Sequence, residues 1–512
     1  NTAVPVKTLP FDNKANFSIV IDMPDGTALP TTANFTRRVA AELTDIEEIV
    51  ASQNYIGAAQ PFDFNGLVRH YYLRQFAWQS EIAIQLIDKT LRERTSHQIA
   101  SMVRERLQPI ALESGAAITV VEMPPGPPVL QTVVAEVHGP DAETRRKVAD
   151  DLTEMFRESG VISDVDNLMR SNMETWRFEI NREKASRQGI SVQTINQHLA
   201  MVMGEFEAAT IFQSLILEPT YIVMTIPIEK RSHLHRLGDL PVMTMDQRTI
   251  PLSELGKFVK VQRDPIIFHK DLRSVEFVVG DAVGRLGAPI YAMLDVERIL
   301  EEKGYTTPDG VVLRSGEYTG APANDKQTGF EWGGEWTVTY ETFRDMGIAF
   351  AVALVGIYML VVWAFGNFVI PAIIMSPIPL TLLGIVPGHW VLGAEFTATS
   401  MIGWIALAGI IVRNSILMVD FTMHSFRTGT PLQEAVILSA KSRTRPILIT
   451  ALALVLGSSV ILLDPIFQGM AVSLLFGVFI STLLTLIVIP LGCISAGEKV
   501  FMEAKDLEEN EA

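Results

Sequence analysis

The sequence predicts an α+β region of split βαβ sandwiches followed by an all-α bundle of five transmembrane helices. Strand and helix signals alternate up to about residue 345, whereas residues 346–495 are overwhelmingly apolar. One strand, turn and helix plan also occurs twice within the first part. The hydrophobic content of 48% therefore averages two very different regions.

The apolar region contains five stretches long enough to cross a bilayer. Residues 346–365 carry no charge, and at a rise of about 1.5 Å per residue they span a hydrocarbon core of about 30 Å. Short polar or Gly/Pro-containing breaks separate this stretch from four more. We expect these at roughly 369–392, 397–421, 446–463 and 471–495.

Basic residues predict the orientation of these spans. The third and fourth spans flank a basic loop, whereas the breaks near Gly393 and Asp464 carry no lysine or arginine. Because basic loops stay on the cytoplasmic side, residues 1–345 are expected outside the cytoplasm and the acidic tail, 496–512, within it. The residues of the basic loop are Arg427, Lys441, Arg443 and Arg445.

Charge and composition exclude one class of partner. The net charge is −16 and no basic stripe is interleaved with aromatic residues, so a nucleic acid would be repelled.

Cys493 is the only cysteine, so no intrachain disulfide can form. The chain begins at Asn1 without a signal peptide, and we expect a fragment or a processed product of a longer protein.

The first part repeats a plan typical of split βαβ sandwiches. FSIVIDMPDGTAL, from Phe17, gives a strand, a Pro-Asp-Gly turn and a helix, and VVAEVHGPDAETRRKVADDL repeats it, with Asp141 as a helix cap. The Pro-rich stretch PPGPPV at 124–129 predicts a boundary between two such units. Between about 181 and 264 the pattern changes, and this indicates an inserted subdomain.

Several strings in this order resemble the C-terminal half of resistance-nodulation-division (RND) transporters, especially their hydrophobe/amphiphile efflux branch. They are LPFDNK, PPGPPV, FEINREKASRQGIS, LGDLPV, GWIALAGIIVRNSILMVDF, RTRPILITALALVLG and DPIFQGMAVSLLFG. The resemblance implies a first porter subdomain at 1–123 and a second at 124–180 and 266–345. It implies a docking subdomain at 181–265, five transmembrane helices at 346–495 and a cytoplasmic tail at 496–512.

The same resemblance implies partners and a location. It places the chain in the bacterial inner membrane as a multi-pass protein, with residues 1–345 in the periplasm. The expected partners are the N-terminal half of the transporter, two further copies in a homotrimer, a periplasmic adaptor protein and an outer-membrane channel. The implied activity is export of hydrophobic or amphiphilic small molecules by proton antiport, without a cofactor.

Arg413 lies near the middle of the third predicted span. An arginine at this depth costs about 2.5–3.5 kcal/mol, so we expect it to face the bundle and pair with an acid. The other four spans contain no acid at comparable depth. The resemblance implies two aspartates in the N-terminal half, usually facing a lysine where Arg413 stands here. Since arginine keeps its proton, Arg413 would be a fixed counter-charge.

Other candidate residues are less distinctive. By resemblance Asn414 and Thr450 match polar members of the proton relay, although the Thr450 hydroxyl is equally expected to bond to its own helix. The aromatic-rich segment 54–78 is a candidate substrate-binding loop or, with equal weight, a packing surface. Its candidate contacts are Tyr55, Phe62, Phe64 and Tyr71.

Competing functions stay open at this point. His233 and His235 form an HxH pattern without a third evident ligand, so no metal site is predicted. Heavy-metal efflux by the same architecture is one alternative, because Met201, Met203, Met243 and Met245 are soft ligands, although packing explains them more simply. An accessory secretion or assembly subunit is another. No nucleophile and base pair indicates an enzyme, and GDAVGRLG lacks the Lys-Ser/Thr of a nucleotide loop.

Overall fold

The computed structural model describes most of the chain. The described residues are 3–10, 12–61, 63–122, 126, 129–169, 173–204, 206–213, 216–227, 233–244, 246–264 and 266–504, apart from the side chains of Asn65 and Arg285. The four prolines of the predicted boundary and residues 505–512 of the tail therefore lie outside them. Contacts divide the chain into two compact units, Asn1–Met169 with Ile267–Ala512, and Arg170–Ile266.

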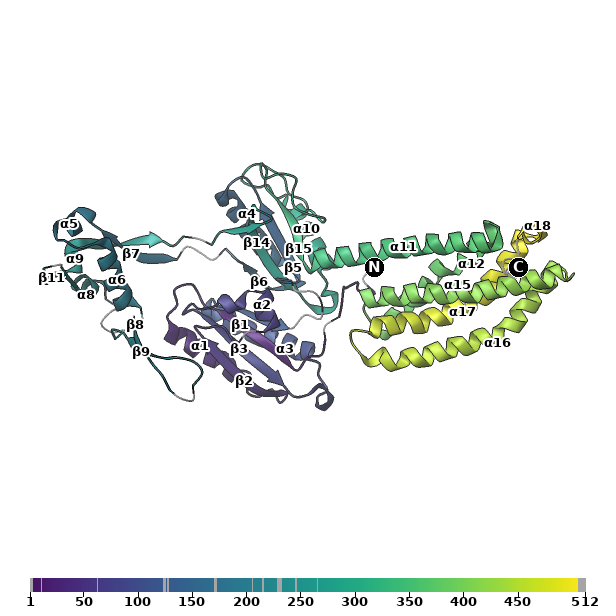
Figure 1. The fold of residues 1–512 in the computed structure, drawn as a ribbon, viewed down its shortest axis with the longest axis horizontal. Coiled ribbons are helices and arrows are strands. Elements are labelled where there is room, and N and C mark those ends of the chain that lie inside the picture. Colours follow the sequence, from purple (N-terminus) through teal and green to yellow (C-terminus); the bar gives the residue numbers. More distant parts are fainter. Residues whose placement is uncertain are drawn as a thin grey trace. The chain divides into compact units, whose positions relative to one another are not determined.

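The first sandwich of the larger unit is a four-stranded antiparallel sheet in the order β2-β3-β1-β4, the order of a split βαβ unit (Figure 1). Gly26, at φ 87°, makes the turn after β1, and the Thr27 N–H donates to the Pro24 carbonyl. Thr95 and Gln98 form a capping box that starts α3. The elements are β1 (Asn16–Asp22), α1 (Leu29–Ala41), β2 (Ile49–Ile56), α2 (Phe64–Val68), η1 (Tyr71–Leu73), β3 (Gln79–Leu86), η2 (Lys89–Leu91), α3 (Ser96–Ser114) and β4 (Ala117–Glu122).

The second sandwich repeats this strand order as β6-β14-β5-β15, and β13 extends the pairing of β14. Asp141 caps α4, as the sequence predicts, by accepting from the Thr144 N–H at 2.8 Å. Val133, Ala135 and Val137 of β5 belong to the hydrophobic core on one face, so the alternate residues face away from it. The elements are β5 (Val133–His138), α4 (Ala142–Glu158), β6 (Ile162–Asn167), β13 (Phe268–Lys270), β14 (Arg273–Ala282), η3 (Gly284–Leu286), α10 (Pro289–Lys303) and β15 (Gly329–Gly334).

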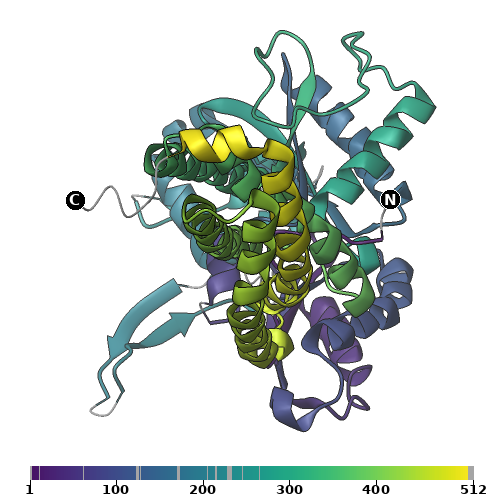
Figure 2. The same cartoon turned by 90° about the vertical axis from the view of Figure 1, so that its right-hand side faces the viewer.

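The smaller unit is inserted between β6 and β13. Its β7 pairs with β12 from Glu174 onward. The inserted unit therefore begins before residue 181, the start that the sequence pattern indicates. The β8–β9 hairpin forms an extended ribbon within this unit (Figure 2). The elements are β7 (Glu174–Ile180), α5 (Arg182–Arg187), α6 (Val192–Met203), β8 (Phe206–Ile211), β9 (Thr220–Met224), α8 (Leu234–Gly238), β10 (Pro241–Met243), β11 (Thr249–Pro251), α9 (Leu252–Leu255) and β12 (Gly256–Gln262).

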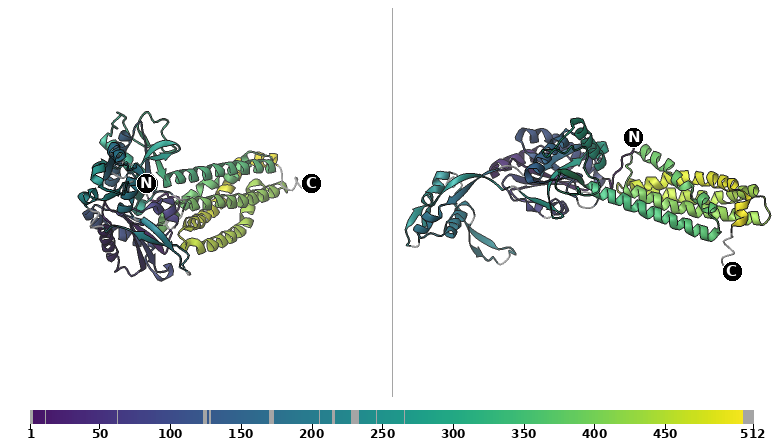
Figure 3. Two further views of the ribbon diagram at one scale, coloured as in Figure 1. Left: turned by 60° about the vertical axis from the view of Figure 1, so that its left-hand side comes forward. Right: turned by 90° about the horizontal axis from the view of Figure 1, so that it is seen from above.

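Five helical stretches in the described part of the larger unit are long and apolar enough to cross a membrane, and they run side by side (Figure 3). The second is broken into three helices around Pro377 and Pro379, which lack the N–H that a continuous helix requires, whereas Pro387 lies within the third of them. The elements are α11 (Glu335–Phe365), α12 (Val369–Met375), α13 (Pro377–Leu380), α14 (Leu382–Leu392), α15 (Ala398–Arg427), α16 (Leu432–Ser459), η4 (Val460–Leu463), α17 (Gln468–Ala496) and α18 (Glu498–Glu503).

Three of these helices extend six or more residues beyond the spans that the sequence predicts. α11 begins at Glu335 rather than 346, α15 ends at Arg427 rather than 421, and α16 begins at Leu432 rather than 446. Hydropathy detects only the apolar part of a helix, whereas backbone hydrogen bonding continues into the polar flanks. Consequently, three residues expected in a basic loop lie within α16, namely Lys441, Arg443 and Arg445.

The bundle is closely packed where α14 meets α17. A Cβ on Gly384 would lie 2.7 Å from the Phe476 carbonyl oxygen and 2.5 Å from a side-chain carbon of Ile480. A Cβ on Gly388 would likewise meet the Phe476 ring at 2.4 Å. These two glycines therefore allow the broken second span to approach α17 closely.

Gly384→Ala should destabilise the bundle, because the new methyl group meets a backbone oxygen that cannot rotate away. We expect a loss of about 1–3 kcal/mol. Gly356→Ala is the matched control, since a Cβ there meets nothing within 4 Å. Thermal unfolding followed with a thiol-reactive dye measures the difference, because Cys493 is 1% exposed and reacts only when the bundle opens. Equal melting curves for the two variants would show that the α14–α17 contact is loose.

Candidate functional site

Arg413 lies at the centre of α15. It follows Ala398 by 15 residues and precedes Arg427 by 14, so either helix end is roughly 21 Å away at helical rise. Its side chain is exposed in this chain, whereas the neighbouring residues Ile411, Val412 and Ser415 are buried. Within the described part of the chain no hydrogen bond or ion pair reaches the guanidinium. The expected acidic partner is therefore not supplied by residues 266–504.

The two other predicted relay residues lie on α15 and α16. Asn414 is half-buried beside Arg413. The Thr450 hydroxyl donates to the Pro446 carbonyl at 3.0 Å, which is the bond to its own helix that the sequence allowed. In the α-helix, the Pro446 carbonyl is already the usual acceptor for the backbone N–H of Thr450, so the hydroxyl bonds to the same carbonyl as its own backbone. A relay role for either residue stays a prediction.

The predicted substrate residues lie in different surroundings. Phe62 is outside the described residues, and Phe64 is exposed at the start of α2. The Tyr55 hydroxyl donates to the Gln53 side chain at 2.7 Å on the edge strand β2. The Arg74 guanidinium lies over the Tyr71 ring, 5.7 Å from its centre. Tyr71 thus has a packing partner, whereas Phe64 presents free apolar surface.

A charged cavity between the two sandwiches was not predicted from the sequence. Arg69 and Arg104 of the first sandwich line it together with Asp281 of β14 and Glu335 of α11. Arg69 lies 3.7 Å from Asp281, and Arg104 pairs with Asp164 at 3.0 Å. Burial raises the pKa of Asp164 to about 6. Burial would also raise the pKa of Asp281, but Arg69, the Thr132 N–H and Arg104 hold it below its usual value.

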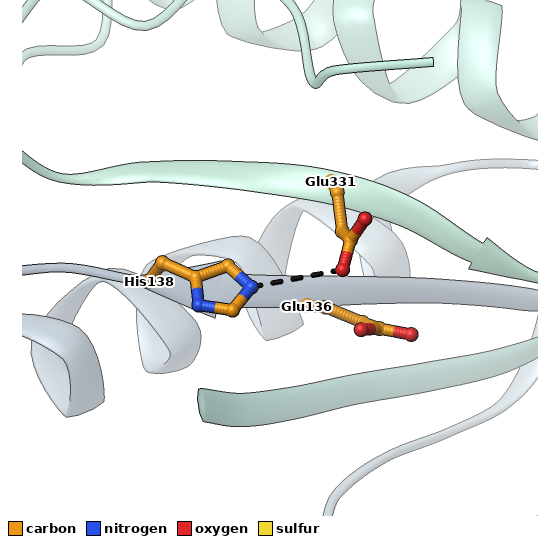
Figure 4. A group of neighbouring side chains, drawn as sticks. All are labelled: Glu136, His138 and Glu331. Atoms are coloured by element: carbon orange, nitrogen blue, oxygen red, sulfur yellow. Dashed lines mark ion pairs between the residues drawn. The ribbon is translucent and has the colours of Figure 1, made fainter. Parts of the chain in front are cut away.

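A second polar cluster lies on the second sheet, on the face opposite its helices. β5 and β15 place Glu136 directly across from Glu331, and His138 follows two residues along on the same face. The three residues are 5%, 6% and 1% exposed, respectively. The Lys270 ammonium lies 2.6 Å from Glu136 and 3.1 Å from Glu331. Figure 4 shows the His138 ring pointing toward Glu331, at 3.7 Å.

The two carboxyls of this cluster differ in their protonation. Burial raises the pKa of Glu136 to about 7. Burial alone would also raise the pKa of Glu331, but contacts with His138, Glu136 and Lys270 lower it to about 2. Two carboxyls so close together titrate as a pair, so near neutral pH Glu331 is ionised while Glu136 binds the last proton.

The bundle and the inserted unit hold histidines whose surroundings the sequence did not reveal. His389 of α14 is fully buried, with its ring nitrogens 2.8 Å from the Ile385 carbonyl and 2.9 Å from the Ser400 hydroxyl. In the inserted unit, His233 and His235 line a hollow together with Met203. Their ring centres are 5.6 Å apart. Met201 is half-buried, Met243 is exposed, and Met245 is outside the described residues.

Residues 1–494 match a protein-family model described as the AcrB/AcrD/AcrF family. The chain belongs to this family. Its members are RND permeases, which are transporters and not enzymes, so the resemblance found in the sequence is confirmed.

Similar proteins in this family carry different names. The chain is 24% identical over 362 residues to the swarming motility protein SwrC of Bacillus subtilis, covering 69% of this chain and 32% of SwrC. It is 25% identical over 323 residues to the cobalt-zinc-cadmium resistance protein CzcA of Cupriavidus metallidurans, covering 61% and 28%. It is 25% identical over 335 residues to the multidrug resistance protein MdtC of Klebsiella pneumoniae, covering 64% and 30%.

The chain spans about a third of the length of the curated relatives it matches. Among solved structures, a heavy metal efflux pump superposes with a TM-score of 0.76 at 18% identity, covering 96% of this chain and 48% of that one. Similarity at this identity shows the fold. The family members named for metals and for drugs leave the substrate class open.

Asp281→Ala should destabilise the contact between the two sandwiches. It removes the charge beside Arg69 and the acceptor for the Thr132 N–H and hydroxyl, at 3.1 and 3.0 Å. A buried cation left without its partner costs about 3–5 kcal/mol. Hydrogen exchange of the β5 and β14 amides measures this loss.

The control for this variant is Glu302→Ala, which removes an exposed ion pair with Arg298 on α10. An exposed pair at this spacing contributes about 0.3–0.5 kcal/mol. If both variants exchange alike, the buried charges of the cavity do not hold the sandwiches together.

Proposed function

We propose that this chain is the C-terminal half of an inner-membrane permease that uses the proton-motive force to export hydrophobic or amphiphilic small molecules. One observation carries the proposal. Arg413 is a permanent cation at the middle of an apolar helix, and its side chain is exposed in this chain. A charge at this depth cannot face lipid without a large cost, so another membrane segment with acidic side chains covers it.

The chemistry of arginine fixes how such a pair would couple to protons. The guanidinium keeps its charge, so the acids facing Arg413 must be the groups that bind and release protons. While Arg413 is close, it lowers the pKa of an acid by about 1–3 units. A movement that separates them raises that pKa and favours proton uptake. Alternation between the two positions couples proton flow to movement of the helices.

The extramembrane units have proposed roles in this pump. Residues 1–123, 124–180 and 266–345 form two porter subdomains in the periplasm, and 181–265 form the docking subdomain that meets an outer-membrane channel. A periplasmic adaptor completes the assembly. The exposed apolar residues Phe212 and Leu217, between β8 and β9, support contact with a neighbouring copy in a homotrimer, since such surface is usually covered.

Heavy-metal efflux is the second candidate function. The names of the relatives CzcA and CnrA include cobalt, zinc, cadmium and nickel. In this chain, the hollow lined by His233, His235 and Met203 supports this candidate, because imidazole and thioether groups bind transition metals. Export assays with dyes and with divalent cations on the complete permease discriminate between the two candidates.

Arg413→Ala in the complete permease should abolish export without preventing insertion, because the acids that face it lose their counter-charge and stay protonated. Arg413→Lys should retain partial activity, since the positive charge is kept and the planar guanidinium is lost. Dye efflux from proteoliposomes across an imposed pH gradient measures both, with trimer content determined in parallel.

Arg445→Ala is the control for this pair, because Arg445 is an exposed cation near the start of the apolar part of α16. It should export normally. If well-assembled Arg413→Ala pumps with an unchanged pH dependence, Arg413 is structural and its proposed role in the proton relay fails.

Replacing Phe62 and Phe64 by alanine should change the range of exported compounds and leave assembly intact. Phe64 is exposed at the start of α2, where an aromatic ring offers contact area to apolar ligands. Leu91→Ala, at an exposed apolar residue of η2, is the control. Susceptibility to a panel of compounds is the measurement, and an unchanged panel would favour a packing role.

A further inference from the structure

The buried cluster on the face of the second sheet opposite its helices has the composition of a metal site. We propose that Glu136, His138 and Glu331 bind a divalent transition-metal cation such as Zn²⁺, Co²⁺ or Ni²⁺. The proposal does not rest on the transport function, because the cluster belongs to the extramembrane sheet. Its three side chains come from the paired strands β5 and β15 (Figure 4).

The distances fit a small coordination sphere. One ligand atom from each of the three side chains lies within 4.8 Å of the others. The His138 Nε2 is 3.7 Å from a Glu331 carboxylate oxygen, which is too long for a hydrogen bond. Two ligands bound to Zn²⁺ at about 2.0–2.1 Å in a tetrahedron lie about 3.3–3.4 Å apart. A shift of a few tenths of an ångström therefore brings this pair to the required separation.

The histidine provides an independent observation that points to a ligand. His138 is 1% exposed, and neither of its ring nitrogens has a hydrogen-bond partner among the described residues. Burying an imidazole in this way costs free energy that a hydrogen bond would normally recover. A metal ion bound to Nε2, the nitrogen that faces Glu331, would satisfy that nitrogen.

The charges leave room for a divalent ion in place of an ammonium. Lys270 lies between the two carboxylates, but its side chain is 40% exposed, so its head can move into water. When both carboxyls are ionised and His138 is neutral, the two carboxylates and the Lys270 ammonium together carry a net charge of −1. A divalent cation balances the two carboxylates completely, and this favours the exchange of Lys270 for the metal.

The ligand types select the class of ion. One imidazole nitrogen and carboxylate oxygens suit borderline cations, whereas Cu⁺ and Ag⁺ prefer sulfur. Ca²⁺ takes six to eight oxygens, which is more than two carboxylates offer. Three protein ligands leave a fourth position for water. Because β15 runs directly into α11 at Gly334, a metal held by Glu331 would stiffen the junction between the sheet and the first membrane helix.

Zinc binding to the 512-residue chain in detergent tests the proposal. The parent protein carries His233→Ala and His235→Ala, which removes the exposed histidine pair as a competing site. Titration with ZnCl₂ should show one bound ion per chain. Binding should raise the melting temperature and slow hydrogen exchange of the β5 and β15 amides.

Three variants of this parent assign the site. His138→Gln and Glu331→Gln should each weaken zinc binding at least tenfold, since each removes a ligand. Lys270→Met should bind zinc several-fold more tightly, because the competing cation is gone, and zinc should restore any stability that this variant loses. Glu302→Gln, at an exposed position of α10, should bind as the parent does.

The outcomes separate a metal site from a simple ion-pair cluster. Absence of zinc binding in the parent overturns the proposal, and so does binding that His138→Gln and Glu331→Gln leave unchanged. If the ligand variants do not fold, Lys270→Met decides: tighter binding and recovery of stability support the site. Weaker binding, or no recovery, shows that Lys270 is the permanent cation of the cluster.

Discussion

A charge removed from water must meet an opposite charge, and much of this structure follows from that constraint. Arg413 lies at the middle of an apolar helix, and no described residue of this chain pairs with its guanidinium, so we propose that an acidic group of another membrane segment faces it. In the extramembrane part the same requirement is met internally. Arg69 with Asp281, and Arg104 with Asp164, join the two sandwiches through paired charges. In the extramembrane part, the opposite charges that buried charges require come from within this chain.

The carboxylates of these pairs lie on strands, Asp164 on β6 and Asp281 on β14. Asp281 lies at the end of β14 and accepts from the Thr132 N–H just before β5, so the backbone of one sheet fixes the carboxylate that the other sandwich must meet. Glu136 and Glu331 face each other because the β5–β15 register sets them side by side. Strand pairing allows little freedom in such distances, and the buried carboxylates retain perturbed proton affinities as a result.

The sequence predicts local features of the fold well and distant contacts poorly. The strand at Phe17, the turn at Gly26 and the cap at Asp141 depend on neighbouring residues, and each is found where its pattern places it. The helix ends at Glu335, Arg427 and Leu432 were misplaced because apolarity marks the hydrocarbon core and not the hydrogen-bonded helix. Arg413 was detectable because an unaccompanied charge in an apolar run is itself a signal. The His138 cluster was not, since Glu331 lies 193 residues further along the chain and only the fold brings the two together.

The broken second span has a mechanical consequence. Prolines at 377, 379 and 387 interrupt its hydrogen bonds, so α12, α13 and α14 resist bending much less than an unbroken helix such as α15. Close contacts at Gly384 and Gly388 clamp one end of this segment onto α17, while Asn367 caps its other end through the Val369 N–H. Because the segment α12–α14 is held at both ends and bends easily between them, it stores little elastic energy when the neighbouring helices slide. The second span can therefore absorb displacement within the bundle that its stiffer neighbours would otherwise oppose.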